Sequence, residues 1–213
     1  MSDTSEAMRS KMQEKGVMES AIKAFERARS LVEKGGKGEL SEKEIVQAAG
    51  VTDYEELERQ ASMDPALLAQ TVVIKLNGGL GTGMGLEKVK SLLEVRPGVA
   101  FLDLMSRQIL SLRKETGSDV RFLLMNSQAS SQDTQEYLAT SVPEIGDPAQ
   151  LELMQNWVPK LRQDDLSPVN FSANTDLEWC PPGHADVYPS LVGSGWLDKL
   201  LADGVKYAFI SNS

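Results

Sequence analysis

The chain has 213 residues, of which 41% are hydrophobic and 25% are charged, proportions that are ordinary for a globular protein with a core of its own. Its formal net charge of -9 and the absence of a Lys/Arg cluster argue against a nucleic-acid partner. Cys180 is the only cysteine, and there is neither a signal peptide nor an apolar run of about 18 residues, so the composition predicts a cytoplasmic protein without a membrane partner.

Residues 1 to about 35 are predicted to be mostly helical. Apolar side chains recur there at three- and four-residue spacings and form one stripe among charged residues: Met18, Ile22, Phe25, Ala28 and Val32. A cluster of glycines between positions 35 and 38 ends this pattern.

Shorter helical segments complete the first third of the chain. Ser41 and Glu44 have the spacing of a capping box and predict a helix that reaches Ala49. Asp53 is placed to cap a helix over residues 55–60, and Asp64 precedes a proline that opens a further turn. Because none of this carries a chemical motif, residues 1–70 are interpreted as a helical N-terminal appendage.

The pattern changes at Thr71, where strands begin to alternate with helices. Strands are predicted at 72–76, 120–125 and 207–210, and helices at 101–115, 131–139 and 195–202. The apolar side of the last helix is expected to hold Trp196, Leu197, Leu200 and Leu201. This order predicts an α/β fold with a parallel sheet over residues 71–213.

A glycine-rich loop follows the first predicted strand, in the stretch from Leu76 to Gly85 (LNGGLGTGMG). The carboxyl end of a strand is where an α/β sheet places a phosphate site, and closely spaced glycines let successive N–H groups approach phosphate oxygens. The glycine spacing does not fit the dinucleotide fingerprint, and Val89 before Lys90-Ser91 excludes a P-loop. A flexible turn that binds nothing is the alternative.

Lys90 follows this loop and has two interpretations. If the loop surrounds a triphosphate, the lysine can reach back to it as a mobile point charge. Otherwise it is a solvated lysine on the surface, and its spacing alone does not separate the two.

The stretch from Trp179 to Asp186 (WCPPGHAD) is the second unusual segment. Its prolines make the loop rigid, and Gly183 permits a tight approach. The loop presents His184, the only histidine of the chain, which either contacts a ligand or has a structural role. Asp186 is interpreted as a loop cap, and Trp179 as a packing residue.

Together these segments resemble the UDP-glucose pyrophosphorylase family. The resemblance rests on the stretch 75–85 with Lys90-Ser91, on 101–104 (FLDL) and 124–127 (LMNS), on Gln155 before Pro159, on 179–186, and on the end 207–213 (YAFISNS). It extends from about residue 50 to the last residue. Ala185 and Cys180 depart from the residues usual in that family.

The resemblance implies roles for individual residues. Backbone groups from Leu76, Asn77, Gly78 and Gly79 would surround UTP, and Lys90 would be the catalytic lysine on its phosphates. Gln155 and Gly183 would read the uracil, since a side-chain amide suits its donors and acceptors. His184 and Asn212 would hold the sugar phosphate, and Asn212 and Ser213 would also contact UTP.

The resemblance further implies a Rossmann-like (GT-A-like) nucleotidyltransferase fold with a mixed, mainly parallel sheet. Its reaction forms UDP-glucose and pyrophosphate from UTP and glucose 1-phosphate, with Mg²⁺ as cofactor. No metal ligand is expected within the chain, because the family's metal-binding aspartate would be residue 214. We therefore expect the chain to end inside its catalytic domain and to be inactive by itself.

Two alternatives remain open at this stage. One is a UDP-N-acetylhexosamine pyrophosphorylase, which Asn77 and Gly83 disfavour because that loop usually has Ala and Arg in their places. The other is a nucleotide-binding fragment without catalytic activity.

Overall fold

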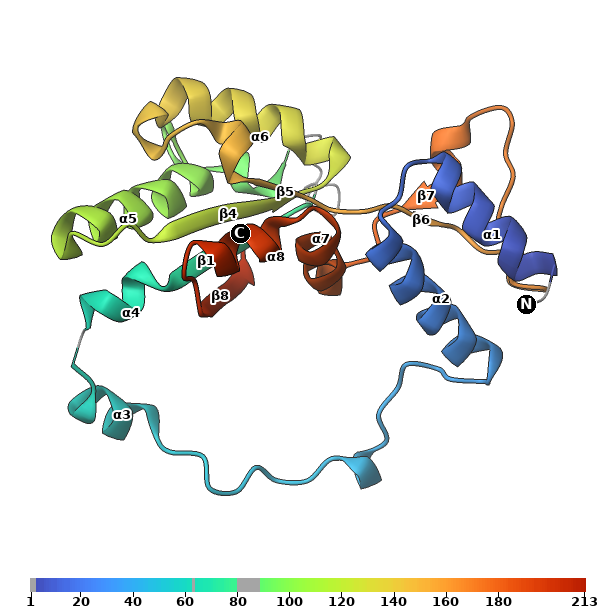
Figure 1. Cartoon of the computed structure of the whole chain (residues 1–213), viewed down its shortest axis with the longest axis horizontal. Coiled ribbons are helices and arrows are strands. Elements are labelled where there is room, and N and C mark those ends of the chain that lie inside the picture. The colour runs from blue at the N-terminus through green and yellow to red at the C-terminus, as the bar shows by residue number, and fades with distance from the viewer. Residues whose placement is uncertain (1–2, 63, 80–88) are drawn as a thin grey trace.

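The structure is a computed structural model that describes residues 3–62, 64–79 and 89–213 (Figure 1). Its helices are α1 (Asp3–Glu14), α2 (Glu19–Glu33), α3 (Tyr54–Gln60), α4 (Pro65–Ala69), α5 (Phe101–Thr116), α6 (Gln128–Ser141), α7 (Val187–Gly193) and α8 (Trp196–Ala202). Its strands are β1 (Thr71–Asn77), β2 (Glu94–Arg96), β3 (Val99–Ala100), β4 (Arg121–Asn126), β5 (Glu152–Met154), β6 (Val158–Pro159), β7 (Trp179–Cys180) and β8 (Tyr207–Asn212).

A parallel sheet with the strand order β5-β4-β1-β8 is the centre of the fold (Figure 1). Strand β1 pairs with β4 on one side and with β8 on the other, both in parallel, and β4 pairs in parallel with β5. The predicted α/β fold with a parallel sheet is confirmed. So are the strands expected near 72–76, 120–125 and 207–210, whose observed bounds lie within two residues of the predicted ones.

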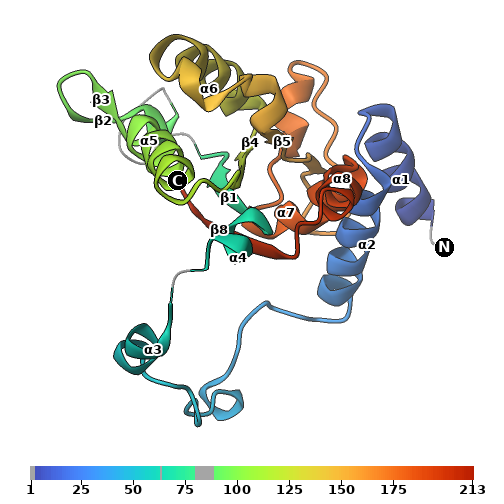
Figure 2. The same ribbon diagram turned by 60° about the vertical axis from the view of Figure 1, so that its left-hand side comes forward.

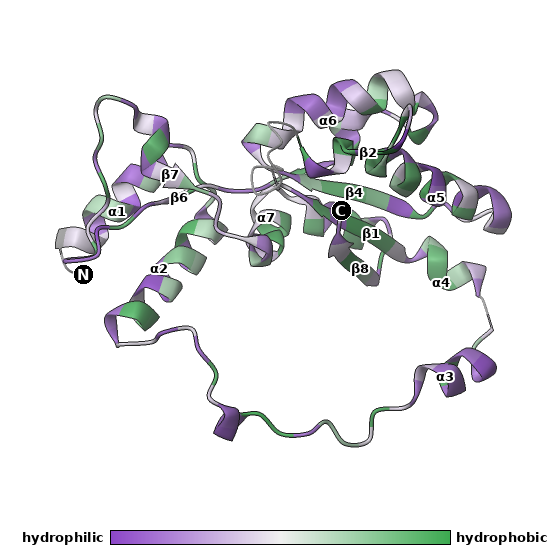
Figure 3. Cartoon of the chain, turned by 180° about the vertical axis from the view of Figure 1, so that it is seen from behind, coloured by the Kyte–Doolittle hydropathy of each residue, from purple (hydrophilic) through white to green (hydrophobic). Residues whose placement is uncertain are grey.

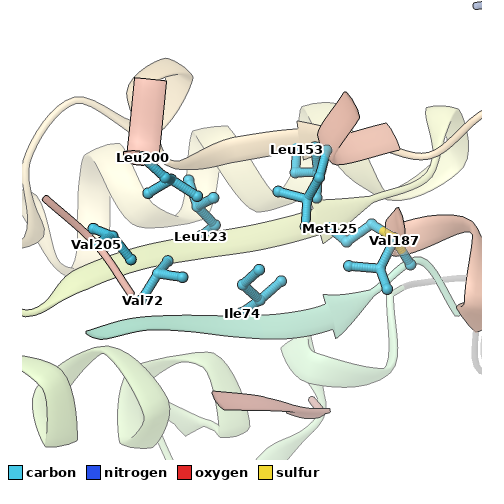
Figure 4. Close-up of a cluster of buried hydrophobic side chains, with 9 residues drawn as sticks. Val72, Ile74, Leu123, Met125, Leu153, Val187, Leu200 and Val205 are labelled. Carbon is cyan, nitrogen blue, oxygen red and sulfur yellow. The ribbon is translucent and has the colours of Figure 1, made fainter. Parts of the chain in front are cut away.

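Helices cover both faces of this sheet (Figure 2). Alternate residues of β4 point to opposite sides, so Phe122 and Leu124 pack with residues of α5 and α6, whereas Leu123 and Met125 pack with residues of α7 and α8. Figure 4 shows the cluster that contains Leu123 and Met125, in which Ile74 of β1 is fully buried. Figure 3 shows the hydrophobic colour of β1 and of the edge strand β8, which is mostly exposed. A strand buried on both faces explains the continuous apolar runs in the sequence.

The N-terminal helices α1 and α2 pack against the second half of the chain. Met12 and Ile22 form a buried cluster with Trp179, which confirms the packing role expected for that tryptophan. Lys11 donates hydrogen bonds to Val169 O at 2.6 Å and to Glu178 Oε2 at 2.5 Å. A division of the chain at residue 70 stays a prediction.

Replacing Lys11 with methionine is expected to lower the melting temperature at neutral pH. The hydrogen bond from Lys11, followed by one from the Phe171 N–H, lowers the pKa of the Glu178 carboxyl. A lowered carboxyl pKa contributes stability above the ordinary value of about 4.3 and loses it as the pH falls through the folded value. The difference between wild type and Lys11→Met should therefore be largest near pH 7 and shrink below about pH 4.

Lys23→Met is the matched control, since Lys23 lies 3.9 Å from Glu19 in an exposed pair on one helix. Exposed pairs of this kind contribute little. Thermal unfolding followed by circular dichroism between pH 3 and 7 measures both variants, and a pH-independent effect of Lys11→Met would contradict the assigned role of Glu178.

The predicted helix from Ser41 to Ala49 is wrong. Only a short 3-10 turn forms at Glu42–Glu44, although the capping box expected between Ser41 and Glu44 is present. Every residue from 31 to 62 is exposed, and a short helix without tertiary packing is marginal in water. The cap predicted at Asp53 is confirmed, because its side chain accepts a hydrogen bond from Glu55 N. The turn predicted after Asp64 is confirmed as α4, and Asp64 accepts a hydrogen bond from Ala66 N.

Two other helical predictions need correction. The helix expected over residues 1–35 is divided, with α1 ending at Glu14 and α2 beginning at Glu19, and Val32 of its apolar stripe is 50% exposed. In α8 Leu200 is buried as expected, but Leu201 is 60% exposed. Within the residues placed by the structure, no helix has the length and apolar character needed to cross a membrane.

Candidate functional site

The carboxyl ends of the sheet strands meet at one edge. Strand register places Asn77 beside Asn126, and Asn126 beside Met154, while Leu76 lies beside Asn212 on the other side. The segments that follow these strands therefore come together, as is typical of ligand sites in open α/β sheets.

A buried polar network holds this edge together. Asn77 Nδ2 donates to Asn126 Oδ1 at 2.8 Å and to Thr134 Oγ1 at 2.9 Å, and Ser91 Oγ donates to Asn77 Oδ1 at 2.6 Å. Asn126 Nδ2 in turn donates to Glu152 Oε1 at 2.8 Å. Since Asn77 is 1% exposed, its side chain joins β1 to β4, α6 and the segment after the glycine loop.

A cavity of about 360 Å³ opens at this edge. It is lined by Gly78, Gly79, Ser127, Gln128, Ala129, Gln155, Asn156, Trp157 and Pro181. The volume lies in the range of small-molecule sites. The walls are the end of β1, the start of α6, the segment after β5 and the proline loop.

Gln155 is a buried polar residue of this cavity and is held by hydrogen bonds from both its backbone and its side chain. It is 5% exposed, its backbone N–H donates to Asn126 O at 2.8 Å, and its Nε2 donates to Gly183 O at 2.9 Å. Gly183 has φ of 95°, a conformation that favours glycine. Because Nε2 faces a carbonyl oxygen, the network fixes the orientation of the amide and directs Oε1 away from Gly183.

Gly78 and Gln155 are in close approach. A Cβ atom placed on Gly78 would lie 2.8 Å from Gln155 Oε1 and 3.5 Å from Ser127 Cβ. Residue 78 must therefore lack a side chain if Gln155 is to keep its hydrogen bond to Gly183.

Lys90 lies beside Gly79. Its backbone N–H donates to Gly79 O at 3.2 Å, and its side chain passes Gly79, with Cδ 3.7 Å from the position of a Cβ there. The Lys90 side chain is exposed. The rest of the predicted glycine loop, residues 80–85, lies outside the described residues.

The other predicted site residues are near this edge without lining the cavity. Leu76 packs against the core, and its carbonyl oxygen accepts a hydrogen bond from Ser213 Oγ at 3.0 Å. Asn212 is exposed at the end of β8. His184 is also exposed, next to Gly183 in the turn His184–Asp186. Direct ligand contacts of these residues stay predictions.

Several cavity residues were not predicted from the sequence to be site residues. Ser127, Gln128 and Ala129 begin α6 directly after β4, and Asn156 with Trp157 follows β5. The signal for the first group was present, because a helix that starts after a buried strand lies at the carboxyl edge of the sheet. The second group had no such signal, since the three residues of β5 are too few for a recognisable pattern.

A larger cavity of about 620 Å³ adjoins the first. The larger one is also lined by the turn between α1 and α2, from Lys15 to Met18. The residues that line both cavities are Gln128, Ala129, Gln155, Asn156 and Trp157. The N-terminal helices thus contribute walls close to the site.

Comparisons with known proteins agree with this arrangement. The family described as UTP–glucose-1-phosphate uridylyltransferase matches residues 19–213. The enzyme of that name from Solanum tuberosum is 44% identical over 171 residues, covering 76% of this chain and 35% of the relative. The enzyme of that name from Saccharomyces cerevisiae is 40% identical over 167 residues, covering 76% of this chain and 32% of the relative.

Solved structures show the same similarity. A variant of UDP-glucose pyrophosphorylase from Leishmania major, crystallised in complex with UDP-glucose, superposes with a TM-score of 0.93 at 40% identity. The superposition covers 100% of this chain and 44% of that one. The chain thus spans about a third of the length of these curated relatives and less than half of the crystallised protein.

Proposed function

Because the chain belongs to the UTP–glucose-1-phosphate uridylyltransferase family, we propose that its cavity binds UTP for the transfer of a uridylyl group to glucose 1-phosphate, with UDP-glucose and pyrophosphate as products. The observation that carries this proposal is the convergence of Gly78, Gln155 and Gly183 at the carboxyl edge of the sheet. These residues come from segments far apart in the sequence; Gly78 and Gln155 line the cavity, and Gly183 accepts a hydrogen bond from the Gln155 side chain.

The orientation of the Gln155 amide supports uracil as the base. With Nε2 donating to Gly183 O, the free acceptor Oε1 requires a donor from the ligand. The N3 position of uracil carries a hydrogen and can donate to it, whereas N3 of neutral cytosine is an acceptor and would repel it. A site built to pair one hydrogen-bonding pattern rejects the other because polar groups are left unpaired.

The proposed chemistry requires the protein to bind and align two anions. A phosphate oxygen of glucose 1-phosphate attacks the α-phosphorus of UTP, the bond to the bridging oxygen breaks, and pyrophosphate leaves with the electron pair. The attacking oxygen is already negatively charged, so no general base is required. Lys90 beside Gly79 is our candidate for stabilising the developing charge, and His184 with Asn212 for holding the sugar phosphate.

Mg²⁺ is proposed as the cofactor of this reaction and would offset the phosphate charge when bound. Across the described ranges, no group of three or more His, Cys, Asp or Glu side chains is placed to hold a metal ion. Those residues do not fit a metal site held by the protein, and we assign no step to the ion. The cytoplasmic location expected from the composition also stays a prediction.

Calorimetric titration of the 213-residue chain with UTP, CTP and UDP-glucose tests the proposal. We expect UTP and UDP-glucose to bind, and UTP to bind about 5- to 150-fold more tightly than CTP, since the loss of one specific contact to the base costs about 1 to 3 kcal/mol. Equal affinity for UTP and CTP, or no binding of either, would contradict it.

Lys90→Ala is expected to weaken UTP binding by about tenfold, because a hydrogen bond to a charged group contributes about 1.5 kcal/mol or more. Uridine, which has no phosphate, should bind equally well to both proteins. Lys114→Ala is the control, since Lys114 lies in the last turn of α5 and does not line the cavity. If Lys90→Ala weakens UTP and uridine alike, the lysine acts on the fold and not on phosphate.

A further inference from the structure

Asp186 is a buried carboxyl group that contacts Asn156, one of the residues that line the cavity. It is 5% exposed and ends the turn that begins at His184. Its Oδ2 accepts hydrogen bonds from Asn156 N at 2.7 Å, from Asn156 Nδ2 at 3.2 Å and from Ser190 Oγ at 2.9 Å. The sequence indicated a loop cap for this residue, whereas its partners lie on another segment and on α7.

These contacts join the two segments that carry the base-reading groups. Asn156 immediately follows Gln155, and Asp186 lies in the same short loop as Gly183. The segments are therefore linked twice, once through Gln155 Nε2 and Gly183 O and once through Asn156 and Asp186. The second link uses a backbone N–H, so it fixes the path of the chain at Gln155.

The Asp186 carboxyl group is buried among hydrogen-bond donors and has no cationic partner among them. All of the donors named above are uncharged, and burial raises the pKa of the Asp186 carboxyl while its hydrogen bonds to Asn156 and Ser190 oppose the shift. A buried carboxylate without a counter-charge costs stability unless donors surround it. A network of this kind, when its donors are satisfied, makes one arrangement rigid.

We propose that Asp186 is a positioning residue for base selection: it sets the separation between Gln155 and Gly183 and so keeps the Gln155 amide in the orientation that accepts from uracil. This inference rests on the proposed UTP site. It predicts that loss of the carboxyl group changes which base is preferred and not only how stable the protein is. Residues that support a recognition group in this way determine its precision.

Two measurements on the 213-residue chain test the inference. The first is the ratio of the dissociation constants for CTP and UTP, which we expect to fall at least about fivefold in Asp186→Ala, corresponding to about 1 kcal/mol. The second needs no nucleotide: the ¹⁵N-edited NMR signal of the Gln155 side-chain amide, identified by its loss in Gln155→Ala. In Asp186→Ala it should move to the position of exposed glutamines and exchange faster with solvent.

Asp103→Ala is the matched control. Asp103 is 3% exposed and accepts hydrogen bonds from Ala100 N and Tyr137 Oη at the start of α5, and its carboxyl group has no contact with the cavity residues. Its loss should lower stability and leave both the nucleotide ratio and the Gln155 signal unchanged. Asp186→Asn, which keeps one oxygen for Asn156 N, covers the case in which Asp186→Ala does not fold, and a smaller shift in the same direction is expected.

The outcomes separate the two proposals. If the Gln155 signal and the nucleotide ratio are unchanged in folded Asp186→Ala or Asp186→Asn, the positioning role is overturned. If wild type binds neither nucleotide but the Gln155 signal shifts in the Asp186 variants and not in Asp103→Ala, the proposed UTP site fails while the positioning of Gln155 stands.

Discussion

Gln155→Ala is expected to reduce the preference for UTP over CTP by about 1 to 3 kcal/mol, or about 5- to 150-fold in the ratio of dissociation constants. Phosphates are the same in all nucleoside triphosphates, so the glycine-rich segment cannot choose among bases. Gln155 is 5% exposed, and its hydrogen bond to Gly183 O leaves Oε1 as an oriented acceptor. Removal of that acceptor removes the penalty for cytosine along with the contact to uracil.

Gln150→Ala is the control for this experiment. Gln150 is an exposed glutamine that lies before β5, at the opposite end of the strand from Gln155. Calorimetry with UTP and CTP on the three proteins gives the ratios directly. An unchanged ratio in Gln155→Ala would show that another residue reads the base.

Gly78→Ala is expected to weaken the binding of UTP by tenfold or more and to destabilise the fold by about 1 to 3 kcal/mol, the range for an added methyl group in a packed site. The new Cβ would lie 2.8 Å from Gln155 Oε1, well inside van der Waals contact. The Gln155 amide must move to relieve this steric clash, and we expect the movement to break its hydrogen bond to Gly183.

A double-mutant cycle isolates this steric cause. In a Gln155→Ala background the obstructing atom is absent, so adding Gly78→Ala should cost much less than it does in wild type. Gly79→Ala is the comparison, because the nearest described atom to its Cβ would be Lys90 Cδ at 3.7 Å, an ordinary contact. Additive effects of Gly78→Ala and Gln155→Ala would exclude the clash as the cause.

Local sequence patterns predicted most of the elements that build the sheet. The apolar run before Asn77 and the run that ends at Met125 became β1 and β4, and the spacing of Leu102, Met105 and Ile109 became the buried face of α5. These patterns suffice because the spacing of apolar residues in a buried strand or an amphipathic helix follows directly from which of its faces are buried. The same logic failed for residues 41–49, where a correct cap preceded a segment with nothing to pack against.

The sequence by itself therefore determined the parallel α/β fold, the glycine segment at the end of β1 and, through family resemblance, the candidate site residues. Only the tertiary structure decided which of them share a cavity. In the folded chain Gln155 lies between Gly78 and Gly183. The Asn77 side chain belongs to a buried hydrogen-bond network, and Asp186 is hydrogen-bonded to Asn156. The physical reason is that such hydrogen bonds join segments whose separation in the chain leaves no periodic signal, so their partners are set by the packing of the sheet.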